Sequence, residues 1–189
     1  VHIALYPESN DAISFEIYTD NLQEKGEPVT HSQGIVEMSP PTEPEILEVN
    51  TLKSSCNDSY LSAEDCYDAF KSMGLDYGPA HQGIETIFIG ANDILAKLVL
   101  PSSIIETQHQ FTLHPSLMDS ALQASIGFGF RNTVLKDDND GQTVKPLLPF
   151  ALDSLEVIAP CTSDMWAWLR YSSNCSESDL IQKLDVDLC

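Results

Sequence analysis

The distribution of apolar and polar residues predicts strands at the start of the chain. Residues 1–6 and 12–19 are rich in β-branched and aromatic residues, with turn-forming residues between them. Residues 29–38 form a third run of this kind. Prolines and acidic residues crowd residues 39–45, which excludes regular structure there. We therefore expect three strands followed by a linker at 39–59.

The next part of the chain predicts a helix, a hairpin and a second helix. Ser62, followed by acidic residues, is typical of a helix start, and Gly74 of a helix end. Residues 86–89 and 94–100 flank a short turn sequence and predict a β-hairpin. Residues 115–128 begin with a proline and are almost continuously apolar, so we expect one long helix enclosed by other structure.

The last third of the chain predicts a polar loop and more strands. Residues 131–145 are polar and acidic, whereas 150–158 and 165–171 have strand-like patterns, the second alternating around two tryptophans. The order of elements favours an α+β fold in which a mostly antiparallel sheet curls around one long apolar helix.

Charge and cysteine content exclude several classes of partner. The formal net charge is −20, from 29 acidic and 9 basic residues, which argues against binding to nucleic acid or to an anionic membrane surface. No apolar run is long enough to span a bilayer. Five cysteines without close CxxC spacing favour free thiols in a reducing cytoplasm.

Asp119 is the most informative residue, because it lies within the apolar helix. A buried carboxylate costs several kcal/mol unless it is paired or protonated. Gln123 lies four residues later, on the same helix face. In an apolar cavity the acid form would be favoured, and Asp119 would be a proton donor. The alternative, which stays open, is a structural carboxylate paired with an arginine or with backbone amides.

Two other features have both a structural and a functional interpretation. The Tyr77-Gly78-Pro79 turn and the His81-Gln82-Gly83 segment after it either line a cavity or form a surface turn. His81 is equally compatible with a hydrogen-bonding loop residue and with a catalytic one. For His114, directly before the helix, we favour a capping role. The acidic stretch 137–141 does not fit a calcium-binding loop, and no zinc-ligand spacing or phosphate loop occurs, so we expect no metal.

Three motifs in this order resemble those of dehydratase domains from modular polyketide synthases. Residues 113–123 resemble the family's HPxLxDxxxQ motif, and residues 77–83 its YGPxxQG motif. Leu148, Pro149 and Phe150 are similar to its LPF element. The sequence between the motifs is most similar to bacterial synthases with a free-standing (trans) acyltransferase.

The resemblance implies a double hot dog fold, with two curled sheets that each wrap a helix. Residues 1–38 would be closing strands of the first hot dog, 39–59 a linker and 60–189 the second hot dog. The implied reaction removes water from a β-hydroxyacyl thioester, which acyl carrier protein holds on phosphopantetheine, and gives an α,β-unsaturated thioester. Asp119 would protonate the leaving hydroxyl and Gln123 would orient it. The substrate would contact Tyr77, Gly78, Pro79, Leu148, Pro149 and Phe150.

The resemblance also implies partners and a missing component. We expect acyl carrier protein and neighbouring synthase domains as partners, a homodimer formed through the parent synthase, and no cofactor bound directly. The family's α-proton acceptor is a histidine in an HxxxGxxxxP motif, which no histidine here matches; His31 comes nearest. We therefore expect a piece of a longer protein that is inactive alone. Alternatives are an isomerase or epimerase on the same fold, or a non-catalytic scaffold.

Overall fold

The chain is described by a computed structural model and forms two compact units, Val1–Pro44 and Glu45–Cys189. For residues 132–135 only the backbone is described. The described residues are 1–9, 11–20, 27–38, 40, 43, 45–135, 148–173, 175–176 and 179–189.

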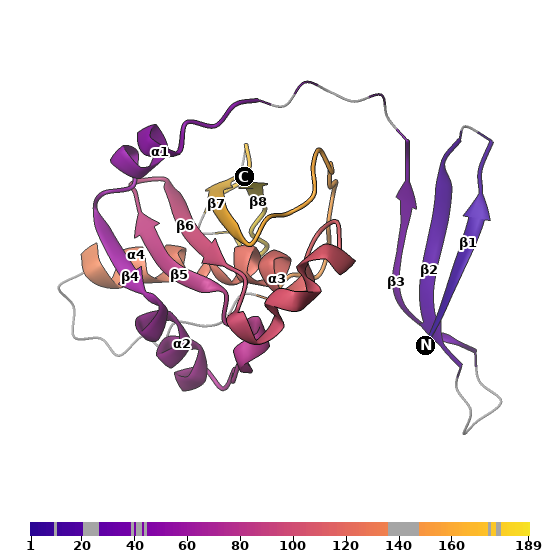
Figure 1. Cartoon of the computed structure of the whole chain (residues 1–189), viewed down its shortest axis with the longest axis horizontal. Coiled ribbons are helices and arrows are strands. Elements are labelled where there is room, and N and C mark those ends of the chain that lie inside the picture. Colours follow the sequence, from indigo (N-terminus) through magenta and orange to yellow (C-terminus); the bar gives the residue numbers. More distant parts are fainter. Residues whose placement is uncertain are drawn as a thin grey trace. The chain divides into compact units, whose positions relative to one another are not determined.

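The first unit is a three-stranded antiparallel sheet in the order β1-β2-β3 (Figure 1). The strands are β1 (His2–Pro7), β2 (Ile13–Thr19) and β3 (Val29–Val36), which confirms the three predicted strands. Apolar side chains stay open to solvent on this sheet; Ile3 is 68% exposed and Ile35 66%. The unit therefore contains apolar side chains that it does not itself bury.

The second unit is built on a five-stranded antiparallel sheet in the order β4-β5-β6-β7-β8. The strands are β4 (Ser59–Ser62), β5 (Ile84–Ile89), β6 (Asp93–Val99), β7 (Asp164–Tyr171) and β8 (Leu184–Leu188). The predicted hairpin is confirmed as β5 and β6, and the tryptophan-containing strand as β7. Alternate side chains from the central strands fill the core, so these strands are fixed in register by the face that they bury.

Among the residues that the structure describes, four α-helices and two 3₁₀-helices accompany this sheet. The first two are α1 (Val49–Ser55) and α2 (Ala63–Ser72). Ser62 forms the predicted N-cap of α2, and its hydroxyl accepts from the backbone N–H of Asp65. Gly74 ends the segment in the left-handed conformation, at φ +84°. The remaining helices are η1 (Pro79–His81), η2 (Ser102–Gln110), α3 (Pro115–Gln123) and α4 (Ile126–Leu135).

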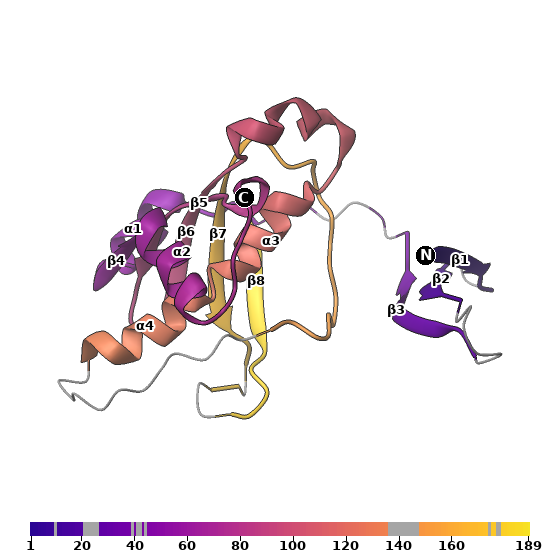
Figure 2. The ribbon, with the colours of Figure 1, turned by 90° about the horizontal axis from the view of Figure 1, so that it is seen from below.

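Helices α3 and α4 follow each other along one face of the sheet, against β5 and β6 (Figure 2). Gly127 permits this close packing, because a Cβ atom there would lie 2.8 Å from Ile94 Cδ1. We predicted one continuous helix over 115–128, and that is wrong. Hydrogen bonds tighten to i→i+3 spacing after Gln123, as between the Ser125 N–H and the Leu122 carbonyl, and this divides the helix.

Three further predictions are corrected. The linker 39–59 is too long, because α1 forms within it and Lys53 Nζ lies 4.5 Å from the centre of the Phe88 ring on β5. The expected strand 150–158 has no regular structure and is exposed, because its backbone pairs with no strand among the described residues. The expected loop 131–145 begins as the last turns of α4; its remainder, with the acidic stretch 137–141, lies outside the described residues. Within the described part of the chain, no helix is long and apolar enough to cross a membrane.

Candidate active site

The start of α3 is fixed by His114, as predicted. Its Nδ1 accepts a hydrogen bond from the Ser116 N–H at 3.2 Å. The Thr107 hydroxyl donates to the Ile104 carbonyl, so Thr107 Oγ1 accepts from His114 Nε2–H at 3.0 Å. Burial lowers the pKa of His114, and the charge on His81 lowers it further. A neutral His114 therefore caps the helix that carries Asp119.

Asp119 does not lie in an enclosed apolar cavity, contrary to our expectation. Its side chain is 37% exposed. The physical reason is that α3 turns another face to the sheet: Leu117 and Ala121 are buried there, whereas Leu122, near Asp119 on the outer face, is 43% exposed. Asp119 therefore lies on the outer face of α3 and not in the core of this unit.

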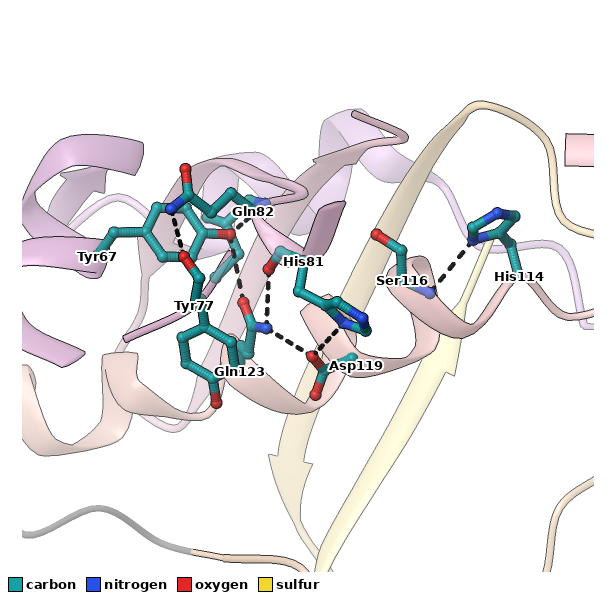
Figure 3. Close-up of polar contacts among 9 residues, drawn as sticks. Tyr67, Tyr77, His81, Gln82, His114, Ser116, Asp119 and Gln123 are labelled. Atoms are coloured by element: carbon teal, nitrogen blue, oxygen red, sulfur yellow. Dashed lines mark hydrogen bonds and ion pairs between the residues drawn. The ribbon is translucent and has the colours of Figure 1, made fainter. Parts of the chain in front are cut away.

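One oxygen of Asp119 is held by two neighbours (Figure 3). Gln123 Nε2 donates to Asp119 Oδ2 at 2.9 Å, which confirms the predicted i, i+4 contact. His81 Nδ1 lies 2.9 Å from the same oxygen. Both contacts fall on Oδ2, and within the described residues Oδ1 is left open to another group. Asp119 is thus paired with a histidine rather than with an arginine.

Gln123 is itself fixed on both sides. Its Nε2 also donates to the His81 carbonyl at 3.0 Å, and its Oε1 accepts from the Tyr67 hydroxyl at 3.2 Å. The Tyr67 oxygen in turn accepts from the Ile84 N–H at 3.0 Å. Burial raises the pKa of Tyr67, so its hydroxyl keeps the proton that it donates. A chain of hydrogen bonds therefore runs from the backbone of β5 to the carboxyl group of Asp119 (Figure 3).

The turn before β5 packs directly on α3 and α2. Tyr77 packs edge-on against Phe70, with ring centres 5.0 Å apart. Burial raises the pKa of Tyr77, and the charge of Asp119 raises it further. A Cβ atom at Gly83 would lie 2.6 Å from Ser120 Oγ, so only glycine allows the turn to approach the helix this closely. The structure thus brings Tyr77 and His81 to the Asp119 face, while Gly78 and Pro79 are exposed.

Leu148, Pro149 and Phe150 are described but exposed. Leu148 is 68% and Phe150 78% exposed, and no described contact joins them to Asp119. Two pockets of about 650 and 690 Å³ lie elsewhere, one beside η2 and one around Trp168. Asp119 lines neither pocket. Within the described ranges, no three His, Cys, Asp or Glu side chains come together as metal ligands would.

Sequence reasoning missed Tyr67 as part of this site and left His81 undecided. The one signal that the sequence offered for Tyr67 was a hydroxyl-bearing ring within a helix. A carboxyl group held at one oxygen and open at the other can bind a hydroxyl group or pass a proton to it. The geometry is that of a positioned acid or base on the outer face of a helix.

Comparisons with known proteins agree with the three motifs. The family model described as polyketide synthase dehydratase N-terminal domain matches residues 46–189. Polyketide synthase PksM of Bacillus subtilis (strain 168) is 38% identical over 189 residues, which is 100% of this chain and 4% of that protein. Polyketide synthase PksN of the same organism is 39% identical and is covered to 3%.

Solved structures show the same fold. A crystal structure of a trans-AT polyketide synthase dehydratase domain from Brevibacillus brevis has a TM-score of 0.86 and 42% identity, covering 98% of this chain and 61% of that one. The dehydratase domain from the CurF module of the curacin synthase has a TM-score of 0.75 and 20% identity, which shows likeness of fold alone.

The chain therefore has the α+β hot dog fold of dehydratase domains, as predicted. The chain belongs to the polyketide synthase dehydratase family. It spans about 4% of the length of the curated relatives that it matches and 61% of the Brevibacillus domain. The isomerase, epimerase and scaffold alternatives gain no support from the comparisons.

Proposed function

We propose that this chain supplies the acid of a dehydratase site in a polyketide synthase. The carrying observation is the asymmetric binding of Asp119: Gln123 and His81 hold Oδ2, and Oδ1 remains for the substrate. In the reaction a base removes the proton next to the thioester carbonyl, and the β-carbon–oxygen bond breaks. The hydroxyl leaves as water with the proton of Asp119, and the thioester becomes α,β-unsaturated.

The exposure of Asp119 fits a role in a larger parent protein. A dehydratase also needs a base for the α-proton, and among the described residues only His81 and Gln123 form hydrogen bonds with the Asp119 carboxyl group. Residues 1–38 would close a first hot dog that carries the base, and 60–189 would form the second. The base would be supplied by the rest of the parent domain, and residues 1–189 alone would be inactive.

Substrate contacts follow from the same assignment. Tyr77, Gly78 and Pro79 would border the acyl chain near Asp119, and Leu148, Pro149 and Phe150 would cover it once the parent domain is complete. The β-hydroxyacyl group would arrive on the phosphopantetheine of an acyl carrier protein. The neighbouring synthase domains, a homodimer through the parent, and the cytoplasm are the expected setting.

The first experiment tests the parent dehydratase domain with two substrates. The parent dehydratase domain is incubated with a 3-hydroxyacyl thioester and, separately, with a 2-enoyl thioester, and the products are identified by mass spectrometry. Dehydration of the first without movement of the double bond in the second supports the proposal. An isomerised second substrate with an unchanged first would refute it.

A parallel incubation uses residues 1–189 alone. The proposal expects no dehydration by this shorter chain, and a rate equal to the parent domain would refute the need for a further base. Circular dichroism of both proteins verifies that each is folded before the rates are compared.

A further inference from the structure

His81 is attached to the site by its main chain as well as by its ring. Its N–H donates to the Gly78 carbonyl at 2.8 Å, which closes the turn of η1. Its carbonyl accepts from Gln123 Nε2 at 3.0 Å. With both backbone groups bound, the position of His81 is set by η1 and α3 together. The imidazole then reaches Asp119 with 49% of the His81 side chain exposed.

The two hydrogen-bond donors at Asp119 bind the same oxygen of its carboxyl group. Gln123 is held against Oδ2, because Tyr67 donates to its Oε1 and the His81 carbonyl accepts the other hydrogen of its Nε2. His81 Nδ1 is the second donor to this oxygen, so both hydrogen bonds of the carboxyl group fall on Oδ2. These two hydrogen bonds leave Oδ1 as the oxygen of Asp119 that can meet the substrate hydroxyl.

We infer that His81 is a positioning residue for Asp119: it binds Oδ2, so that Oδ1 is the oxygen presented to the substrate hydroxyl. This inference rests on the proposed function. His81 acts through Asp119 and does not need to contact the substrate. His81 Nδ1 carries a hydrogen in the charged ring and in the neutral tautomer that is protonated at Nδ1, so it can donate in either form.

We expect loss of the contact between His81 and Asp119 to lower kcat rather than to raise KM. Losing a hydrogen bond to a charged group that matters during bond breaking lowers kcat by about 10- to 100-fold. KM stays within about twofold, because the same substrate contacts remain. His81→Leu removes the donor and keeps much of the ring's volume.

Rescue by a conservative variant separates positioning from packing. In His81→Asn the amide nitrogen replaces Nδ1, whereas in His81→Gln it lies closer to the place of Nε2 and misses Oδ2. We expect His81→Asn to restore most of kcat and His81→Gln to resemble His81→Leu. If His81→Leu does not fold, the Asn and Gln variants still decide, and equal kcat values for these two would overturn the inference.

The steady-state experiment uses the parent dehydratase domain and a 3-hydroxyacyl thioester. His109→Leu, at an exposed histidine of η2, is the matched control and should keep the parent kcat. An unchanged kcat in His81→Leu overturns the inference. Asp119→Asn is measured beside it: an active Asp119→Asn refutes the proposed function, whereas an inactive one with a normal His81→Leu refutes only the role of His81.

Discussion

Replacing Tyr67 by phenylalanine tests the hydrogen-bond chain behind Asp119. The change removes one oxygen atom and leaves the ring packed against Phe70 and Tyr77. Two buried groups lose their partner: the N–H of Ile84, a residue that is 3% exposed, and Oε1 of Gln123, which is 4% exposed. The substitution therefore isolates the polar role of Tyr67 from its apolar one.

The size of the effect follows from these two groups. A buried donor or acceptor left without a partner costs about 1–3 kcal/mol. Both groups lose a partner here, and small shifts let water reach one of them in part, so we expect the free energy of unfolding to fall by about 2–4 kcal/mol. The freed Gln123 amide would also turn, which weakens its hold on Asp119.

Urea denaturation followed by tryptophan fluorescence measures this change, because Trp166 and Trp168 both lie on β7 of the same unit. Tyr60→Phe is the matched control, since Tyr60 is 70% exposed and should change stability by less than about 0.5 kcal/mol. Equal stabilities of the Tyr67→Phe and Tyr60→Phe chains would refute the reasoning, as would a stabilised Tyr67→Phe chain.

Three further predictions concern stability. The pKa of His114 is lower in the folded chain than in the unfolded chain, so the unfolded chain binds a proton at the higher pH. The free energy of unfolding therefore has its full value above about pH 6.5 and falls as the pH decreases through that value. Urea titrations at several pH values should show this slope, and His114→Asn, which keeps a cap acceptor, should flatten it. Gly83→Ala forces a methyl group onto Ser120 Oγ and should cost about 1–3 kcal/mol in a thermal melt, while Gly78→Ala, in open space, should not destabilise. Ser62→Ala removes the cap of α2 and should cost about 1 kcal/mol by the same assay.

Elements with a local signal could be predicted from the sequence. Alternating apolar residues around a short turn gave β5 and β6, and Ser62 with the acids after it gave the start of α2. The contact of Asp119 with Gln123 was predictable because four residues make one helical turn. His114 was predictable as a cap because it precedes a proline at the first helical position.

Features that depend on tertiary contacts could not be predicted. The break between α3 and α4 comes from a few hydrogen bonds of shorter spacing, which no residue pattern announces. The exposed segment 150–158 has the pattern of a strand, but a strand also needs a partner. Tyr67 meets Gln123 across 56 residues, and His81 meets Asp119 across 38, so only the folded sheet brings them together.

The account depends most on Asp119 as the acid. The decisive measurement follows the mass of a β-hydroxyacyl group on acyl carrier protein during incubation with the parent dehydratase domain. We expect Asp119→Asn to slow the loss of water by about 100- to 10,000-fold. Asp68→Asn, the same change at an exposed position of α2, should leave the rate unchanged. Loss of water by the Asp119→Asn domain at the parent rate would contradict the account.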